Sequence, residues 1–568
     1  MTPAEIAAAL REIAAYVDLE GNRFRARAYE RAARSIGAVA ELDRLIAERR
    51  LDELPGIGKS LARVIEELAT RGRIELLERL RERWPRVVLE LAALPEVGPE
   101  RARRLHEGLA PTSLEEVAAL CEAGRVRKLP GFGRVSEARV LEAIRTRHER
   151  GALLTLEDAR LASEELASIV RAAPGVADVQ VCGPVRRWME VADRVVLAVA
   201  SDDPRTLLAR TRSYAATVAL DEAQQDGARD GARIGVLRGQ LASGVVCELY
   251  VASRERFGVA LVLATGSHGH LAALRAHARE RGTELERIAA PDEATLYAAL
   301  GLPWLPPEVR DGTDEIAAAL AGDRFDDLIA LEDLAGAVHC HTTYSDGKHT
   351  IAQMAQAAAA RGLGYLTITD HSRSAGYAGG LTLDRIGQQW LEIDAAQRAT
   401  SVRLLRGTES DILADGSLDY PHDVLAQMDV VIASIHQRHK LDVDAMTRRV
   451  VTALRQPIFK IWGHALGRIL LHRDPIAVHF DRVLDAIGDS RVAVEINGDP
   501  RRLDLDPERA RLARARGARF VLSADAHATG QLDYLANAVG IARRARIRRH
   551  EVLNTLPPDE FARAVRPA

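Results

Sequence analysis

The pattern of apolar and polar residues changes along the chain, and each change predicts a different kind of structure. Residues 1 to about 150 place Ala and Leu at helical spacing between Glu and Arg, which is typical of amphipathic helices. Residues from about 155 to 250 gather their apolar residues in short, Val-rich runs that favour β-strands. After a return to helix and loop from about 258 to 320, short apolar runs alternate with helical segments from 333 onward. This last rhythm predicts a parallel sheet or barrel.

Composition and charge are those of a multidomain globular protein. The 568 residues are 47% hydrophobic and 28% charged, with a formal net charge of −3, which argues against a chain that is basic throughout. The four cysteines lack Cys-x-x-Cys spacing, which fits a reducing compartment. No apolar run reaches the ~18 residues of a membrane span, and the N-terminus has no signal pattern. We therefore expect a cytoplasmic protein with no membrane partner.

One short motif occurs three times in the N-terminal part, each time before a helical segment. The copies are Leu54–Ala62, Leu94–Ala102 and Leu129–Ala138, with Glu96 making the second copy the weakest anion site. A Gly-rich turn at a helix N-terminus presents free N–H groups and the positive helix end to a phosphate, without reading base sequence. One such turn could merely join helices, but three copies favour nucleic-acid binding. The residues expected to contact the DNA backbone are Gly56, Gly58, Lys59, Gly98, Gly131, Gly133 and Arg134.

These helix-hairpin-helix motifs, together with a later segment, resemble family X DNA polymerases. Asn22–Ile36 resembles a helix of their small N-terminal domain, and Leu300–Gly312 also resembles the family. Gly183–Glu190 has the frame Gly-x-x-Arg-Arg-x-x-Glu of the nucleotidyltransferase palm. Two interpretations stay open for Arg186 and Arg187, together with Arg194: they form a basic DNA contact, or they only hold the fold.

The residues that this resemblance assigns to polymerase chemistry are replaced. Pro184 stands at the phosphate-binding Ser, Arg194 and Val196 stand at two metal-binding Asp residues, and Glu248 occupies the third carboxylate position. One carboxylate cannot hold two divalent ions. A guanidinium about 4 Å from such an ion would cost roughly 8 kcal/mol at an effective dielectric of ~20. We expect a retained palm that binds no Mg²⁺ and performs no templated nucleotide addition.

Metal-type side chains recur at the ends of seven β-like runs in the C-terminal part. Six runs end in His or a carboxylate, and the seventh carries Glu495 and Asn497. In a parallel βα barrel these ends meet at one mouth, where active sites are built. A lone His at a strand end is more often structural, but this recurrence favours one shared cluster. The nine candidate ligands, which we also expect to be catalytic, are His339, His341, Asp346, His371, Glu409, His436, His464, Asp525 and His527.

The charges of the cluster indicate its substrate. Asp346, Glu409 and Asp525 supply −3, and neutral His supplies no charge. Three divalent ions would add +6 and leave an excess that suits oxygens from water and phosphate, as in phosphodiester cleavage. Mixed His and Asp ligation favours Zn or Mn over Mg.

The cluster resembles the polymerase and histidinol phosphatase (PHP) domain, whose nine metal positions match these nine residues. A family X polymerase followed by a PHP domain is the architecture of the bacterial PolX family. That resemblance implies a metal-dependent 3′–5′ exonuclease that processes DNA ends in base excision repair. Arg468, Arg501 and Arg502 either pair with substrate phosphates near the mouth or are surface or ion-paired arginines. Two alternatives stay open: an active gap-filling polymerase with PHP proofreading, and a PHP phosphatase acting on a small phosphate monoester.

The predicted fold is multidomain, α and α/β, and its partner is DNA at ends, gaps and single strands. We expect a monomer. The segments are a helical DNA-binding domain with the first hairpin (1–85), a fingers-like helical domain with two further hairpins (86–152), a degenerate palm (153–255), a thumb-like domain (256–318), a linker (319–333) and a distorted seven-stranded PHP barrel (334–568).

Overall fold

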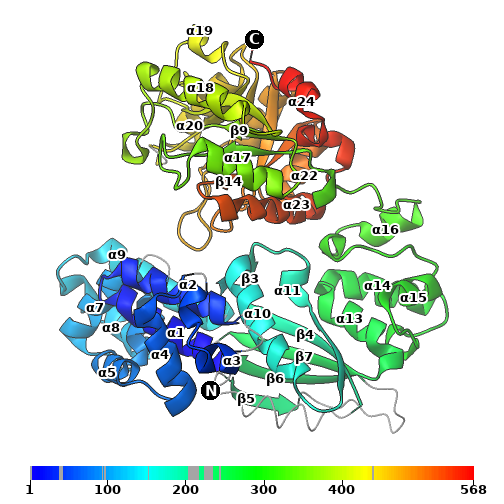
Figure 1. Ribbon diagram of the computed structural model, residues 1–568. Helices are drawn as coiled ribbons and strands as arrows, with labels where there is room; N and C mark the ends of the chain where they lie inside the picture. Colours follow the sequence, from blue (N-terminus) through cyan, green and yellow to red (C-terminus); the bar gives the residue numbers. More distant parts are fainter. Residues whose placement is uncertain are drawn as a thin grey trace. The chain divides into compact units, whose positions relative to one another are not determined.

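The computed structural model divides into two compact units, whose parts are shown in Figure 1. The first comprises Met1–Leu154, Arg160–Val181 and Asp193–Arg254, and the second comprises Thr155–Ala159, Cys182–Ala192 and Glu255–Ala568. Pro55, Pro95 and Glu96 of the hairpin motifs lie outside the described residues. The structure describes residues 3–37, 42–54, 56–92, 94, 97–150, 153–202, 217–222, 234–241, 245–437 and 440–567.

Helices make up the N-terminal part of the first unit, as the apolar spacing predicts. In the first of them, Ile6, Leu10, Ile13 and Val17 lie on one face and are buried. They join one core with the buried residues of the following helices. The helices are α1 (Pro3–Leu19), α2 (Arg23–Gly37), α3 (Leu42–Ala47), α4 (Lys59–Arg71), α5 (Glu75–Arg83), α6 (Arg86–Ala92), α7 (Gly98–Leu109), α8 (Leu114–Glu122) and α9 (Arg134–Arg150).

Each of the three repeated motifs opens a helix, because α4, α7 and α9 begin at or directly after a motif glycine. Gly56, Gly98 and Gly131 have φ angles of 80°, 66° and 82°, a left-handed conformation that favours glycine over other residues. Lys59 and Arg134, at the starts of α4 and α9, are exposed. The left-handed backbone conformation therefore explains why glycine stands at these three positions of the motif.

A five-stranded sheet lies in the first unit together with most of helix α10 (Leu156–Arg171). Its strand order is β2-β4-β7-β6-β5, and only the β4 and β7 pair is parallel. Val196 on β4 lies directly opposite Glu248 on β7, so the expected polymerase positions are neighbours. The strands are β2 (Val176–Val181), β4 (Arg194–Ser201), β5 (Thr217–Glu222), β6 (Gly235–Leu241) and β7 (Val246–Ala252).

Short helices precede the barrel in the second unit. Every residue of α13 is buried, which matches its unbroken apolar sequence. No helix in the described part of the chain is long and apolar enough to cross a membrane. The helices are α11 (Gly183–Arg186), α13 (Phe257–Thr265), α14 (His268–Glu280), α15 (Glu293–Ala299) and α16 (Glu315–Leu320).

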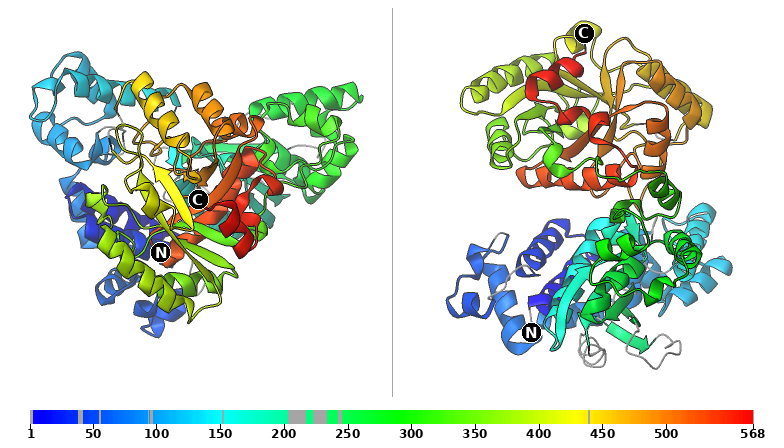
Figure 2. Two further views of the ribbon diagram at one scale, coloured as in Figure 1. Left: turned by 90° about the horizontal axis from the view of Figure 1, so that it is seen from above. Right: turned by 90° about the vertical axis from the view of Figure 1, so that its right-hand side faces the viewer.

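Seven parallel strands form a closed barrel in the C-terminal part of the second unit (Figure 2). They follow one another in chain order, and the last strand pairs with the first. The strands are β8 (Gly336–Cys340), β9 (Tyr365–Ile368), β10 (Arg403–Asp411), β11 (Val430–Ser434), β12 (Lys460–Trp462), β13 (Val492–Asn497) and β14 (Arg519–Ala526). The expected fold class, with a helical hairpin region and a seven-stranded barrel, is confirmed.

The barrel strands are apolar runs because both of their faces are covered. All residues of β8, β9, β11, β12 and β13 are buried, as expected for a parallel sheet wrapped by helices. The helices that alternate with the strands are α17 (Ile351–Ala360), α18 (Leu383–Gln397), α19 (His422–Leu425), α20 (Val443–Leu454), α21 (Phe480–Gly488), α22 (Pro507–Ala515), α23 (Leu535–Arg544) and α24 (Pro558–Ala564).

Candidate metal centre

The nine candidate ligands lie together at the carboxyl ends of the barrel strands. Glu409 and Asp525 lie near the ends of β10 and β14, and the six histidines lie at or just after strand ends. Four groups have ligand atoms within 4.8 Å of one another, and these groups together contain all nine residues. They are His341–Asp346–His371–His527, His339–His341–Glu409, His339–His464–Asp525 and His371–Glu409–His436.

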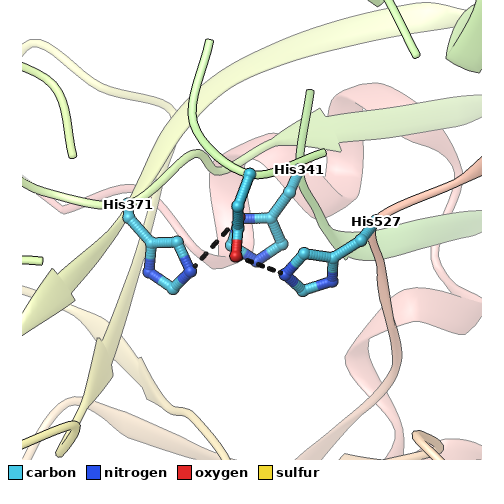
Figure 3. A group of neighbouring side chains, drawn as sticks. His341, His371 and His527 are labelled. Atoms are coloured by element: carbon cyan, nitrogen blue, oxygen red, sulfur yellow. Dashed lines mark ion pairs between the residues drawn. The ribbon is translucent and has the colours of Figure 1, made fainter. Parts of the chain in front are cut away.

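Asp346 lies between two histidines that come from different strand ends. Its carboxylate oxygens are 3.6 Å from His371 Nε2 and 3.4 Å from His527 Nε2, which are the ion pairs drawn in Figure 3. His341 lies beside them, with its ring stacked on that of His527 at a centroid distance of 4.2 Å. One ion could be held by this group.

Glu409 is the central carboxylate of the cluster. It is buried, and its oxygens lie 2.9 Å from His371 Nδ1, 3.1 Å from His436 Nε2 and 2.8 Å from His464 Nε2. A carboxylate with two oxygens turned toward different histidines can bridge two ions. Glu409 therefore joins two of the four ligand groups, because it belongs to both.

Three candidate ligands have backbone conformations that side-chain-bearing residues rarely adopt. The φ angles of His339, His464 and Asp525 are 64°, 23° and 48°. Positive φ at a residue other than glycine costs free energy and gathers at functional sites, where the surrounding structure holds it. The barrel thus holds these three residues in strained conformations that aim their side chains into the mouth.

The surroundings of two buried histidines, His341 and His371, shift their pKa values in opposite directions. Burial, together with the nearby His527 and His371, lowers the pKa of His341 to about 3. Burial opposes the charged form of His371, but Glu409 and Asp346 outweigh it and raise the pKa of His371 to about 10. His341 is therefore neutral and free to ligate, whereas a metal ion bound by His371 would displace its proton.

The hydrogen bonding of the buried ring nitrogens of His339 and His341 tests whether these residues fit metal ions. Among the residues that the structure describes, His339 Nε2 and both ring nitrogens of His341 are buried and find no hydrogen-bond partner. A buried polar atom is normally paired, because leaving it unpaired costs about 1–3 kcal/mol. Their direction into a cluster of carboxylates is what metal ligation requires. The residues therefore fit divalent ions.

Polar residues behind the cluster orient its histidines. Glu495 Oε1 lies 2.5 Å from His339 Nδ1, and Asp411 Oδ1 lies 2.5 Å from His436 Nδ1. Such carboxylates fix the tautomer and the ring orientation of a metal-ligating histidine. Asn497 Nδ2 lies 3.2 Å from both Glu495 Oε2 and Asp525 Oδ2.

Sequence reasoning noted Glu495 and Asn497 only as strand-end residues and missed Asp411. A signal was present for Asp411, because it lies two residues after Glu409 on the same strand and so on the same face. The pattern could not assign it to His436, which ends a different strand.

The three candidate phosphate-binding arginines differ in their contacts. Arg502 Nε lies 3.6 Å from Asp525 Oδ2, and its buried Nη1 has no hydrogen-bond partner. Arg501 is paired with Asp499 and its side chain is 72% exposed. Arg468 is buried and contacts Glu190 and the carbonyl oxygen of Arg502 at 3.3 and 2.9 Å. Arg502 is thus placed nearest the cluster.

The three positions that correspond to polymerase carboxylates, Arg194, Val196 and Glu248, are adjacent in the first unit. Arg194 Nη1 lies 3.6 Å from Glu248 Oε1, and Arg238 Nε donates a hydrogen bond of 2.9 Å to the same oxygen. Val196 is buried beside Glu248. The remaining carboxylate is therefore neutralised by two guanidinium groups.

The Gly-x-x-Arg-Arg frame lies in the second unit and contacts its own neighbours. Pro184 is buried at the start of α11. Arg186 donates two hydrogen bonds to Glu293, at 2.7 and 2.9 Å, while Arg187 donates to the carbonyl oxygen of Thr265. Both arginines, expected either to contact DNA or to hold the fold, have protein partners.

Similarity to known families covers several parts of the chain. Residues 1–74 match a helix-hairpin-helix domain, and residues 88–146 match a SAM-like helix-hairpin-helix tandem. Residues 260–311 match the DNA polymerase beta thumb, and residues 337–499 match the PHP domain. These matches agree with the helical region and the barrel.

Individual relatives show the same division. The chain is 31% identical over 562 residues to the DNA polymerase/3'-5' exonuclease PolX of Bacillus subtilis (strain 168), covering 96% of each protein. It is 29% identical over 228 residues to a probable phosphatase of Caldanaerobacter subterraneus subsp. tengcongensis, covering 38% of this chain and 85% of that protein. A probable phosphatase of Thermoanaerobacter sp. (strain X514) is 28% identical over 231 residues, which cover 38% of this chain and 89% of that protein.

The fold and the site define a polymerase X-type chain joined to a PHP barrel. Because the Bacillus subtilis similarity extends over almost the whole chain, the protein belongs to the bacterial PolX family.

Proposed function

We propose that the protein is a metal-dependent 3′–5′ DNA exonuclease that processes DNA ends in repair and that cuts with its barrel. The observation that carries this proposal is the convergence of nine ligand-type side chains at the barrel mouth. The relative's printed name includes a 3'-5' exonuclease, which supports the polarity. The hairpin domains support DNA as the substrate.

The nine residues would hold up to three divalent ions, with Zn or Mn favoured by the mixed His and carboxylate donors. Such ions supply activation of a water molecule and neutralisation of charge on a phosphodiester. Glu495 and Asp411 orient His339 and His436, and Arg502 offers an unpaired N–H to a phosphate oxygen. The chain thereby positions the substrate phosphate against the cluster.

The palm contributes no nucleotide transfer in this proposal. Glu248 is paired with Arg194 and Arg238, and Val196 offers no ligand atom. Two-metal phosphoryl transfer requires several carboxylates in one place. We therefore assign the palm, together with the hairpins, to holding DNA by its backbone.

The test is product analysis on DNA labelled at its 5′ end. With Mn²⁺, purified protein should shorten a single strand and a gapped duplex stepwise from the 3′ end and release nucleotides. A 3′-terminal phosphorothioate should slow that digestion. Labelled deoxynucleotide added to a primed template should not be incorporated.

Other outcomes identify the alternatives. Primer extension would establish a polymerase and contradict the proposed palm. Rapid hydrolysis of a phosphate monoester with intact oligonucleotides would establish the phosphatase alternative, which the similarity of 38% of the chain to probable phosphatases favours.

A further inference from the structure

Tyr377 lies at the edge of the histidine cluster and is exposed. Its ring centroid is 6.3 Å from the ring of His371 and 6.3 Å from the ring of His436. The residue is 68% exposed, and no other aromatic residue in the described part of the barrel is exposed in this way. A single exposed aromatic residue is ordinary, but this one stands beside the ligands of a candidate active site.

The loop that carries Tyr377 is closed and tied down. Its ends are joined by the bond from Leu381 N to His371 O, at 2.9 Å. Gly379 is left-handed, with φ of 69°, and a Cβ on Gly380 would lie 2.0 Å from the carbonyl oxygen of Ser372. This backbone admits little movement, so the exposure of Tyr377 is a fixed feature of the loop.

The loop is also tied to the cluster through Asp411. One oxygen of Asp411 lies 2.5 Å from His436 Nδ1, and the other accepts a hydrogen bond of 2.7 Å from Ser374 Oγ. The amide nitrogen of Ser374 donates to Asp419 at 2.7 Å. The loop backbone that carries Tyr377 is therefore tied to the candidate ligands.

An exposed aromatic ring on a tied loop, beside the proposed phosphate-cleaving centre, suits one ligand chemistry. Every nucleobase has a flat face that stacks on an aromatic side chain, whatever its sequence. Basic groups lie near the same edge, because Arg473 is close enough to Arg502 and Tyr377 to interact electrostatically with both. A nucleotide whose phosphodiester lies at the cluster would bring its base toward such a ring.

We propose that Tyr377 is a specificity-determining residue that stacks on the base of the terminal nucleotide being removed. The proposal rests on the proposed exonuclease function and adds the group that holds the end of the strand. It makes the enzyme favour ends that carry a base over abasic ends. Tyr377 positions the substrate and takes no part in bond cleavage.

The experiment compares two oligonucleotides that differ only at the 3′ end, which carries thymidine or a tetrahydrofuran abasic residue. Tyr377→Ala should raise KM for the thymidine end about 10-fold, with kcat little changed, since a stacked base contributes that order of affinity. Tyr377→Phe should stay near wild type, and Tyr377→Ala should barely change KM for the abasic end. Leu391→Ala, which removes another exposed apolar side chain of the barrel, should affect neither substrate.

Equal KM for wild type and Tyr377→Ala on the thymidine end would overturn the inference. So would an equal loss by Tyr377→Ala on both ends, or a loss by Tyr377→Phe as large as that of Tyr377→Ala. A wild-type protein that digests neither oligonucleotide would overturn the proposed exonuclease function itself, and the inference with it.

Discussion

The guanidinium of Arg194 lies 3.6 Å from the carboxylate of Glu248 in the palm sheet. Arg238 contacts the same carboxylate oxygen from the neighbouring strand at 2.9 Å. A divalent ion at Glu248 would meet the guanidinium groups of Arg194 and Arg238, and the nearby carboxylate of Asp193 is itself paired with Arg194 at 2.8 Å. The electrostatics of the sheet therefore oppose metal binding where the polymerase resemblance would require it.

The first prediction concerns this carboxylate. Glu248→Gln should leave Mn²⁺-dependent digestion of a 3′ end within about twofold of wild type, because the proposed chemistry lies in the barrel. It should also leave nucleotide incorporation at background in a primer-extension assay. The contrary result would be robust primer extension by the wild-type protein and none by Glu248→Gln. That pair of results would show that the palm is catalytic.

The second prediction concerns the buried ionic group around Glu293. Its carboxylate accepts hydrogen bonds from Arg186 and from the fully buried Arg310, at distances of 2.6 to 3.1 Å. Glu293→Gln should lower the free energy of unfolding by about 3–5 kcal/mol, because it leaves buried guanidinium charge uncompensated. Thermal or denaturant unfolding measures this loss.

The same group predicts a pH dependence of stability. Burial opposes the ionised form of Glu293, but Arg310 and Arg186 outweigh it and lower its pKa to about 2. The stabilisation is present above the ordinary pKa of 4.5 and is lost as pH falls from there toward about 2. Glu293→Gln should show a shallower loss of stability across this window. A loss identical to that of wild type would mean that Glu293 is not the group responsible.

The barrel shows how much of the fold and of the candidate site could be predicted from the sequence. A strand-and-helix rhythm predicts its strands, and candidate ligands stand at or shortly after six of the seven strand ends, so all nine members of the cluster could be predicted without coordinates. Side-chain pairs that are remote in sequence could not be predicted, because the local pattern of residues does not specify which side chains pair in the fold. Arg186 and Glu293 are 107 positions apart, and the bond between them follows only from the packing of α11 near α15. The exposure of Tyr377 likewise depends on loop geometry.

The third prediction concerns the hairpins. The paired changes Lys59→Ala and Arg134→Ala should weaken DNA binding on all sequences and reduce the slope of log K against log salt by about one unit per lost phosphate contact. Both side chains are exposed beside a helix N-terminus. Binding isotherms at several salt concentrations measure the slope. Arg398→Ala, an exposed arginine of the barrel, serves as the control; a slope that changes as much in the control would refute the assignment.

The fourth prediction concerns metal removal. Chelation should abolish nuclease activity and lower Tm, because ions bound among Asp346, Glu409 and Asp525 stabilise only the folded chain. At 100 times Kd, a single ion contributes about 2.7 kcal/mol, so re-addition of Mn²⁺ or Zn²⁺ should raise Tm by several degrees. An Asp525→Asn protein should show a smaller rise. A Tm indifferent to chelation and re-addition would argue against resident ions.

The most direct test of the central claim, that the barrel mouth does the cutting, is Mn²⁺-dependent release of nucleotides from a 3′ end by matched variants. We predict that His341→Ala and Asp525→Ala lose this activity by at least about 100-fold, as expected for removal of a metal ligand. They should bind DNA as wild type does. His479→Ala, a change at a partly exposed histidine paired with Asp444, should retain the activity. Digestion that persists in both His341→Ala and Asp525→Ala would contradict the account.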